Sequence, residues 1–348
     1  MRAVAVPAGR AEDLRRELHR AGIVDRTVRM MKRGAEVLIP VTAEPPLSLG
    51  TYGARIENLD TWEPRPRARD PRADLRERLL RYGVPPELGP SKWERLGDVV
   101  VVRLSEPAHR YDAAIGTALA EVLDARTVVE DLSGIHGVLR TPEVRVLWGR
   151  GMEVVHVEGG VRYMFDVATI MFSSGNLPER TSIPSKVREG TVVVDLFAGI
   201  GYFALPIAVH ARPAAVYACE LNPVAYHYLL ENLRLNRAAN VIPLFGDCRE
   251  TAPRGVADVV LMGHFSAREY LDVAFECLRG TGLVVYHDLC PREQFPKAPT
   301  ARLTEGARSH WYDIESIHTR ILKSYAPGIV HAVLEARVRR RPKAPSSR

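Results

Sequence analysis

Glycines and carboxylates recur at the ends of predicted strands in the second half of the chain. The segment "TVVVDLFAGIGYF" ends a buried strand at Asp195 and continues into a turn through Gly199 and Gly201. Glycines there would let the backbone approach a ligand at the carboxyl edge of a sheet, where such folds bind their ligands. Glu220 ends the next strand, 19 residues after Gly201, and Asp247 follows the third strand. The first carboxylate can accept both hydroxyl groups of a ribose, and the second can accept an adenine amino group.

The spacing of these residues distinguishes between two kinds of adenosine ligand. A dinucleotide-binding turn carries a third glycine, as in Gly-x-Gly-x-x-Gly, but position 204 is an alanine. An adenosyl ligand without a pyrophosphate therefore fits better. The motif "DxFAGxG", followed by an acidic strand end and an Asp after strand three, is similar to that of class I S-adenosylmethionine (SAM) enzymes. A tight turn alone would explain the glycines, but it would not explain the ordered carboxylates.

Strands and helices alternate regularly beyond residue 170. The strands "TVVVDLF", "AVYACEL", "VIPLFGD", "ADVVLMG" and "GLVVYHD" are separated by helical segments such as "NPVAYHYLLENLRLN". Strands that are apolar on both faces and alternate with helices are typical of a doubly wound parallel sheet. We therefore predict an α/β fold with a Rossmann-like, class I SAM-dependent domain over residues 167–340.

Two smaller α+β units are predicted before this domain. The first, 1–62, contains a strand "RAVAVP", a helix "AEDLRRELHRAG" and a hairpin. The stretch "TWEPRPRARDPRADL" is rich in proline and arginine, which is typical of a linker. The second unit, 74–166, ends in "EVVHVEGGVRYMFDV", which alternates around Gly159-Gly160 as a two-residue hairpin does. The tail "RVRRRPKAPSSR" is basic and rich in proline and serine, which predicts disorder.

The composition is that of a globular protein. The 348 residues are 46% hydrophobic and 26% charged, with 42 arginines against six lysines and a net charge of +6. This charge permits an anionic partner, although a GC-rich genome would produce the same arginine bias. No apolar run approaches the roughly 20 residues of a membrane span, and the N-terminus lacks a signal core, so we expect a cytoplasmic protein. Cys219, Cys248, Cys277 and Cys290 fit neither a metal knuckle nor a disulfide framework, so we expect buried free thiols and no metal.

Five ordered blocks resemble a known family. They are "HVEGGVRYMFDVATIMFSSGNLPER", "VVVDLFAGIGYFALPIA", "CELNPVAYHYLLENLRLN", "FGDCRE" and "ILKSYAPGIVHAVLEA". This archaeal and eukaryotic family modifies the purine beside the tRNA anticodon. It contains the tRNA guanine-N1 methyltransferases and the wybutosine-synthesis aminocarboxypropyl transferases. The resemblance covers most of the chain and implies SAM as donor substrate and tRNA-Phe as partner. The 1–62 unit resembles the small domain with which some members grip the tRNA body.

The resemblance also implies further SAM-binding residues. Ser173 and Arg180, in "MFSSGNLPER", match positions that contact SAM from a loop before the first core strand. Arg180 could pair with the anionic amino-acid part of SAM, and a surface salt bridge is the alternative reading. Phe197 lies within the shared "DxFAGxG" motif. Cys248 matches a position that meets the adenine through its backbone N–H, so its thiol would not be needed.

The turn after the fourth strand separates the branches of this family. Guanine-methylating members typically place an Asn-Leu-Pro-type turn there, and the Asn helps to handle the guanine. This chain has Met262-Gly263-His264, which resembles the aminocarboxypropyl branch, as does "VVYHDL" on the fifth strand. The resemblance thus implies transfer of the 3-amino-3-carboxypropyl group of SAM to a carbon of the wyosine precursor, with release of methylthioadenosine. We also predict that the Gly263 turn leaves more space near the sulfonium.

The sequence leaves several alternatives open. A tRNA guanine-N1 methyltransferase on the same scaffold is the nearest, and a DNA or protein methylase is more remote. A non-catalytic tRNA-binding protein with a vestigial SAM site is disfavoured by the intact Gly199, Gly201, Glu220 and Asp247 set. No catalytic residue is assigned. His264 is a candidate proton acceptor, although a role as filler is the favoured explanation, because relatives are expected to carry an aromatic residue there. We expect a monomer.

Overall fold

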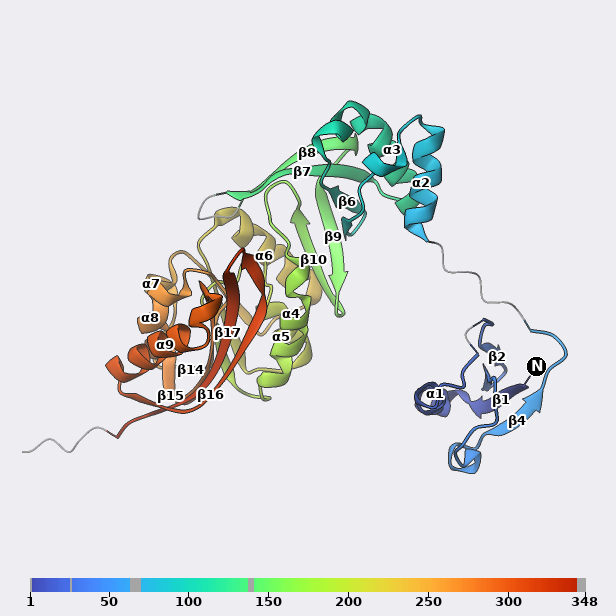
Figure 1. Cartoon of the computed structure of the whole chain (residues 1–348). Helices are drawn as coiled ribbons and strands as arrows, with labels where there is room; N and C mark the ends of the chain where they lie inside the picture. Colours follow the sequence, from blue (N-terminus) through green and yellow to red (C-terminus); the bar gives the residue numbers. More distant parts are fainter. Residues whose placement is uncertain (1, 26, 63–69, 137–140, 343–348) are drawn as a thin grey trace, which may run out of the picture. The chain divides into compact units, whose positions relative to one another are not determined.

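The computed structural model describes residues 2–25, 27–62, 70–136 and 141–342. The chain divides into two compact units, Met1–Asp70 and Pro71–Arg348, and each is described by itself (Figure 1). Of the linker predicted over 61–75, residues 63–69 lie outside the described part. Helix α2, Pro71–Arg81, begins within that predicted linker. The last residues of the predicted linker, 71–75, are therefore helical.

The first unit is a four-stranded antiparallel sheet that packs against one helix. Its strands are β1 Arg2–Pro7, β2 Met31–Arg33, β3 Glu36–Pro40 and β4 Arg55–Asn58. They pair in the order β2-β3-β1-β4. Helix α1, Ala11–Arg20, buries Leu14 and Leu18 in the same core as Val4 and Val6 of β1. The α+β character predicted for this region is confirmed.

The larger unit begins with a second α+β region. Its elements are α2, β5 Trp93–Leu96, β6 Val99–Val102, α3 Asp112–Leu123, β7 Thr127–His136 and β8 Thr141–Gly149. The strands pair in the order β5-β6-β7-β8, with β6 and β7 parallel. Leu79 of α2 and Ile115 of α3 share a core with Val100 and Val128. The two helices therefore cover one face of this sheet, and the predicted α+β character is confirmed.

A hairpin follows, as the Gly159-Gly160 pair predicts. Its strands are β9 Glu153–Glu158 and β10 Val161–Asp166. Gly159 and Gly160 have φ angles of 57° and 82°, and two positive φ angles are what a tight two-residue hairpin turn needs. The Asn232 side chain accepts a hydrogen bond from Met164 N–H at 2.6 Å and donates one to the Met164 carbonyl at 3.1 Å. The hairpin is thereby fixed to the C-terminal sheet domain, whose core includes Phe165.

The C-terminal part contains a seven-stranded sheet, and helices lie on both of its faces (Figure 1). Its strands are β11 Val192–Asp195, β12 Ala215–Glu220, β13 Val241–Phe245, β14 Ala257–Met262, β15 Leu278–Pro291, β16 Tyr312–Ala326 and β17 Ile329–Arg340. Its helices are α4 Leu177–Ser182, α5 Ala204–His210, α6 Pro223–Asn236, α7 Cys248–Thr251, α8 Leu271–Cys277 and α9 Lys297–Ser309. The strand order is β13-β12-β11-β14-β15-β17-β16. Helices α5 and α6 contribute to one core cluster, and α8 and α9 contribute to the other. The predicted doubly wound, class I fold is confirmed.

The last two strands were not predicted, and they make the sheet mixed. The first five strands are parallel, but β17 is antiparallel to both β15 and β16. Only Pro327 and Gly328 separate β16 from β17, and so short a connection can join only antiparallel strands. The disorder predicted from "RVRRRPKAPSSR" is wrong for its first residues, because β17 continues to Arg340. Residues 343–348 lie outside the described part.

The four cysteines are buried free thiols, as predicted. In the described ranges, no helix is long and apolar enough to cross a membrane. The same ranges contain no group of three His, Cys, Asp or Glu side chains that could hold a metal ion.

Candidate cofactor and catalytic site

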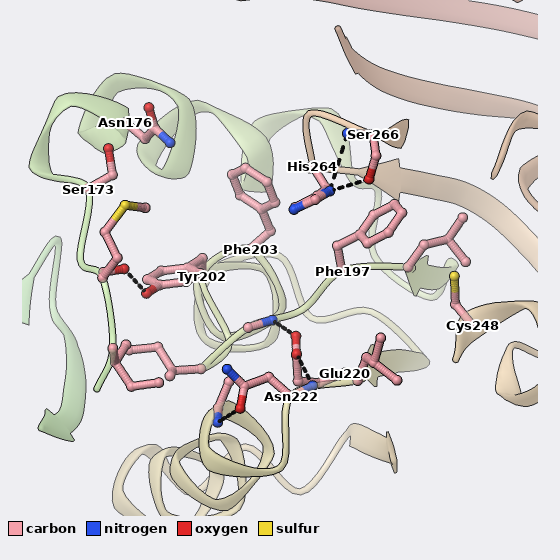
Figure 2. A pocket seen from close by; sticks show the side chains of 18 of the residues that line it. Ser173, Asn176, Phe197, Tyr202, Phe203, Glu220, Asn222, Cys248, His264 and Ser266 are labelled. Atoms are coloured by element: carbon pink, nitrogen blue, oxygen red, sulfur yellow. Dashed lines mark hydrogen bonds between the residues drawn. The ribbon is translucent and has the colours of Figure 1, made fainter. Parts of the chain in front are cut away.

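A pocket opens at the carboxyl ends of the parallel strands (Figure 2). It lies where the strand order turns back, between β11 and β14, which is where doubly wound sheets bind their ligands. The loop before α4, the turn after β11 and the ends of β12, β13 and β14 line it. Seven of the eight predicted cofactor residues contribute to the lining: Ser173, Arg180, Phe197, Gly199, Glu220, Asp247 and Cys248. The candidate His264 also lines the pocket.

Glu220, at the end of β12, holds the glycine turn in place. Its Oε2 accepts a hydrogen bond from Gly199 N–H at 2.7 Å, and its Oε1 accepts one from Asn222 N–H at 2.7 Å (Figure 2). Asn222 in turn caps helix α6 by accepting from Val224 N–H at 2.9 Å. Burial raises the pKa of the Glu220 carboxyl, and its backbone hydrogen bonds oppose that shift. The carboxylate is therefore fixed in the pocket wall before any ligand binds.

The two predicted glycines have different structural roles. Gly199 and Gly201 have φ angles of 57° and 100°, which L side chains rarely adopt. Gly199 lines the pocket, whereas Gly201 packs inward. A Cβ at Gly201 would lie 2.7 Å from the Leu205 side chain and 3.2 Å from the Leu229 side chain. Gly201 thus lets the turn close over the core, and its contact with the cofactor stays a prediction.

Asp195, at the end of β11, is fully buried beneath the glycine turn. Its Oδ1 accepts a hydrogen bond from Phe197 N–H at 3.2 Å, while its Oδ2 has no hydrogen-bond partner in the described part of the chain. Burial raises the pKa of this carboxyl to about 7, and the charge of Glu220 adds to the shift. Burial at this position therefore favours the protonated form of the carboxyl.

Replacing Asp195 with asparagine is expected to change how stability depends on pH. In the unfolded chain an aspartate titrates near 3.9, whereas in the folded chain the pKa of Asp195 is about 7. The folded state holds the proton more tightly, so this group makes stability fall as pH rises from about 4 to 7 and then level off. Asp195→Asn removes that contribution and keeps the oxygen that accepts from Phe197. Urea unfolding at pH 5 and pH 8 measures the free energy of unfolding of both proteins. If that free energy falls by the same amount between the two pH values in wild type and in Asp195→Asn, the assignment is contradicted.

Asp247 and Cys248 lie together at the end of β13. Asp247 caps the short helix α7 by accepting from Arg249 N–H at 2.9 Å. The Arg249 guanidinium also binds its carboxylate and holds the pKa of Asp247 below the usual range. Arg249 lies over the Tyr270 ring, 5.2 Å from its centroid. Burial raises the pKa of the Cys248 thiol to about 12, so this thiol stays neutral. The contact of the Cys248 backbone N–H with the adenine stays a prediction.

Arg180 is engaged more completely than its sequence context predicts. Its side chain is only 2% exposed, and its Nε and Nη2 bind both carboxylate oxygens of Glu158 at 2.5 and 2.6 Å. Its Nη1 donates to the Ser173 carbonyl at 2.8 Å, and the guanidinium lies 4.6 Å from the Phe172 ring centroid. The surface salt bridge that we considered is not what the structure shows, because this ion pair is buried. Glu158 already balances the charge of Arg180, and three of the five guanidinium N–H groups are used by Glu158 and Ser173. The contact of Arg180 with SAM stays a prediction.

The Met262-Gly263-His264 turn differs from our prediction in one respect. Gly263 lines the pocket, but the space beside it is occupied by an aromatic ring. A Cβ at Gly263 would lie 2.5 Å from Cε2 of Phe203, and the φ of Gly263 is not in the left-handed region. Glycine is therefore required for space and not for backbone conformation. The lack of a side chain at position 263 makes room for the Phe203 ring in the pocket wall, so it does not leave the free space that we predicted.

His264 presents one edge of its ring to the pocket. Its Nδ1 lies 2.7 Å from Ser266 Oγ and accepts from Ser266 N–H at 3.2 Å. Since Nδ1 is an acceptor, the neutral ring carries its proton on Nε2. The ring stacks on Phe197 with centroids 5.3 Å apart, and Figure 2 shows its other nitrogen directed toward the pocket. The geometry fits both a polar contact to a substrate and an aromatic wall.

The lining residues that were missed from the sequence include four with polar or aromatic side chains near the glycine turn and the loop before α4: Asn176, Asn222, Tyr202 and Phe203. Asn222 had a usable signal, because Asn followed by Pro223 at a helix start is a typical capping pattern. Tyr202 donates its hydroxyl proton to the Met171 carbonyl at 2.6 Å and so ties the glycine turn to the loop before α4. That contact joins segments distant in sequence, and nothing in the local pattern predicts it.

The strand order and the adenosyl-type pocket define a class I SAM-dependent transferase. Residues 154–315 match the family model of the TRM5/TYW2 methyltransferase domain. Residues 75–152 match the TYW2 N-terminal domain, and residues 3–47 match the tRNA methyltransferase 5 N-terminal domain. The chain belongs to the TRM5/TYW2 family.

Similar curated proteins come from both branches of this family. A Methanocaldococcus jannaschii enzyme, the tRNA(Phe) (4-demethylwyosine(37)-C(7)) aminocarboxypropyltransferase, is 38% identical over 252 residues, 72% of this chain and 98% of that enzyme. The Pyrococcus horikoshii enzyme of the same name is 35% identical over 254 residues, 72% of this chain and 91% of that enzyme. Pyrococcus abyssi Trm5b, a tRNA (guanine(37)-N(1))-methyltransferase, is 31% identical over 339 residues, 97% of this chain and 98% of that enzyme.

Solved structures give the same relationship. The complex of M. jannaschii TYW2 with AdoMet has a TM-score of 0.60 at 35% identity, covering 72% of this chain and all of that one. P. horikoshii TYW2 in complex with MeSAdo has a TM-score of 0.70 at 32% identity, covering 78% of this chain and all of that one. P. abyssi Trm5b has a TM-score of 0.67 at 30% identity, covering 97% of this chain and 99% of that one.

Proposed function

We propose that this enzyme transfers the 3-amino-3-carboxypropyl group of SAM to position C7 of the 4-demethylwyosine base beside the anticodon of tRNA-Phe. The observation that carries the proposal is the Met262-Gly263-His264 turn in the pocket wall. This turn has no side-chain amide that could bind the edge of a guanine. The chain is also 38% and 35% identical to two enzymes named for this activity. The by-product is methylthioadenosine.

We assign each part of SAM to a different set of lining residues. Glu220 accepts from the ribose hydroxyls, and Asp247 with the backbone N–H of Cys248 meets the adenine. In this proposal Ser173 and Arg180 meet the methionine arm, and Phe197 and Gly199 contact the part of SAM between the arm and the adenine. These assignments are supported by the position of each residue in the lining.

Catalysis rests on orientation, because the sulfonium of SAM is already reactive. It carries three electrophilic carbons, and the carbon held in line with the nucleophile reacts. In the proposed transfer, the bond from sulfur to the aminocarboxypropyl carbon breaks and its electron pair stays on sulfur. A carbon–carbon bond forms at the acceptor base, whose ring carbon then loses a proton. His264 is the candidate acceptor for that proton, since neutral imidazole is a suitable base near neutral pH.

A tRNA guanine-N1 methyltransferase is the second candidate. It is favoured by the similarity to Trm5b, which extends over 97% of this chain and includes the N-terminal unit. The absence of an Asn in the 262–264 turn argues against it. Chromatography of a spent reaction on precursor-bearing tRNA-Phe separates the candidates. Methylthioadenosine is expected to rise in step with modified tRNA, whereas accumulation of adenosylhomocysteine would favour methylation.

We further propose that the first unit binds tRNA and takes no part in binding SAM. Its own core and its match to the N-terminal domain of a tRNA methyltransferase support this division. A chain that begins at Pro71 is expected to bind tRNA-Phe at least about 10-fold more weakly and SAM with unchanged affinity. Filter binding and calorimetry measure the two affinities. An equal loss of both in a folded truncation would contradict the division.

A further inference from the structure

Two segments that line the pocket each contact a residue to which no SAM-binding role is assigned. On one side lie Ser173 and Asn176, and on the other lies His264 (Figure 2). Strand β16 reaches the first side, because Lys323 donates to Ser173 Oγ at 3.2 Å and to Asn176 Oδ1 at 2.9 Å. The next residue after His264 is Phe265, whose ring centroid lies 6.4 Å from that of His264. Lys323 and Phe265 therefore both adjoin residues that line the pocket.

An aromatic pair joins these two segments. Phe265 meets the ring of Tyr325, two residues beyond Lys323, edge to face, with centroids 4.8 Å apart. Phe265 also packs edge to face against the ring of His331, with centroids 5.0 Å apart and ring planes at 88°. Tyr325 is 52% exposed, so the protein core does not use much of its surface. Tyr325 thus presents an exposed ring next to residues of the pocket wall, with Phe265 and His331 packed in sequence behind it. An exposed aromatic ring in this position is suited to stacking a planar ligand.

We propose that Phe265 and Tyr325 form the stacking surface for the acceptor base of the tRNA. The inference rests on the proposed function, since it assumes that the substrate is a nucleobase. An enzyme that reacts at a base must take that base out of its stack, and aromatic side chains then replace the lost stacking. The extended tricyclic ring of a wyosine precursor presents a large face to such a surface.

The charge at this edge fits a nucleic acid. Lys323 brings an ammonium group to the border of the pocket, and the chain as a whole carries a net charge of +6. An RNA loop delivers a base together with its flanking phosphates, so an aromatic surface next to a cation matches both parts. The pair is linked to the pocket wall through His264 on one side and, by way of Lys323, through Ser173 on the other.

The test compares Tyr325→Ala with two matched variants in the full chain. Tyr325→Phe keeps the ring and removes only the hydroxyl. Trp311→Asn removes another exposed aromatic, 65% exposed, that immediately precedes the other end of β16. Trp311 has a φ of 62°, which asparagine tolerates better than most residues. Thermal unfolding and SAM calorimetry establish that each variant is folded and binds SAM.

The KM for precursor-bearing tRNA-Phe and the turnover rate at saturating tRNA are then measured. Tyr325→Ala is expected to lower kcat/KM for tRNA by about 10-fold or more, which is the usual scale for losing one base-stacking aromatic. A rise in KM is expected to account for most of this loss. Tyr325→Phe and Trp311→Asn are expected to stay within about twofold of wild type. Unchanged tRNA kinetics in Tyr325→Ala would overturn the inference, as would an equal loss in Tyr325→Phe.

Failure of the proposed function gives a different result. If wild-type enzyme releases adenosylhomocysteine, the transferred group is wrong, whatever Tyr325 does. If wild type releases methylthioadenosine and Tyr325→Ala retains full kcat/KM for tRNA, only the stacking surface is wrong. A Phe265→Leu variant adds a second measurement on the same surface, and it is expected to show the same selective loss toward tRNA.

Discussion

Replacing Arg180 with alanine is expected to lower the free energy of unfolding by about 3 kcal/mol or more. The guanidinium is 2% exposed and the Glu158 side chain 10% exposed. Removing one partner leaves the other as a buried charge without compensation, which is the most costly way to break an ion pair. It also removes the contact of Arg180 with the Phe172 ring and its hydrogen bond to the Ser173 carbonyl. Urea denaturation measures the change.

Two further variants test the cause. Arg180→Ala combined with Glu158→Ala is expected to lose much less than the sum of the single losses, because no unpaired charge remains. Arg180→Lys is expected to fall between wild type and Arg180→Ala, since an ammonium keeps the charge but cannot bind both carboxylate oxygens in a fork. Additive single losses would show that the ion pair is not the source of the stability.

Glu220→Ala is expected to weaken SAM binding by about 2 kcal/mol, or roughly 30-fold. The proposed bonds to the ribose hydroxyls are lost, and the N–H groups of Gly199 and Asn222 lose the acceptor that now holds each at 2.7 Å. The glycine turn is then no longer fixed in its binding conformation. Isothermal titration with SAM measures the affinity.

A matched control removes a carboxylate elsewhere on the same sheet. Glu315 lies on β16, is 38% exposed and pairs with Arg339 at 3.2 Å, so Glu315→Ala changes the net charge equally. Its SAM affinity is expected to match wild type. A folded Glu220→Ala protein with the same affinity as this control would remove Glu220 from the SAM site.

The cofactor pocket was largely predictable because its residues sit at fixed points of a regular pattern. Consecutive parallel strands end at the same edge, so Gly199, Glu220 and Asp247 had to converge once their strands were recognised. The structure brings these three residues into one pocket, as expected. The Gly159-Gly160 hairpin was predictable for a similar reason, since its turn needs only local information.

The features that were missed depend on contacts between distant segments. The Glu158 partner of Arg180 is 22 residues earlier in the chain and comes from the tip of a hairpin. The Phe203 ring beside Gly263 is 60 residues from it in sequence. The β16–β17 hairpin had a local signal in Pro327-Gly328. Nothing local predicted that β17 would pair with β15 and that β16 would form the edge of the sheet. Periodicity assigns a residue to a face of an element, and it does not say which distant side chain packs there.

The central claim is that the methionine arm of SAM, and not its methyl group, enters the tRNA. One measurement tests it most directly. Wild-type protein is incubated with precursor-bearing tRNA-Phe and a mixture of carboxyl-labelled and methyl-labelled SAM, and both labels are counted in the purified RNA. The account predicts that the carboxyl label enters the RNA and the methyl label leaves with methylthioadenosine. Methyl label in the RNA without carboxyl label would contradict the account, even though the fold and the pocket would remain as described.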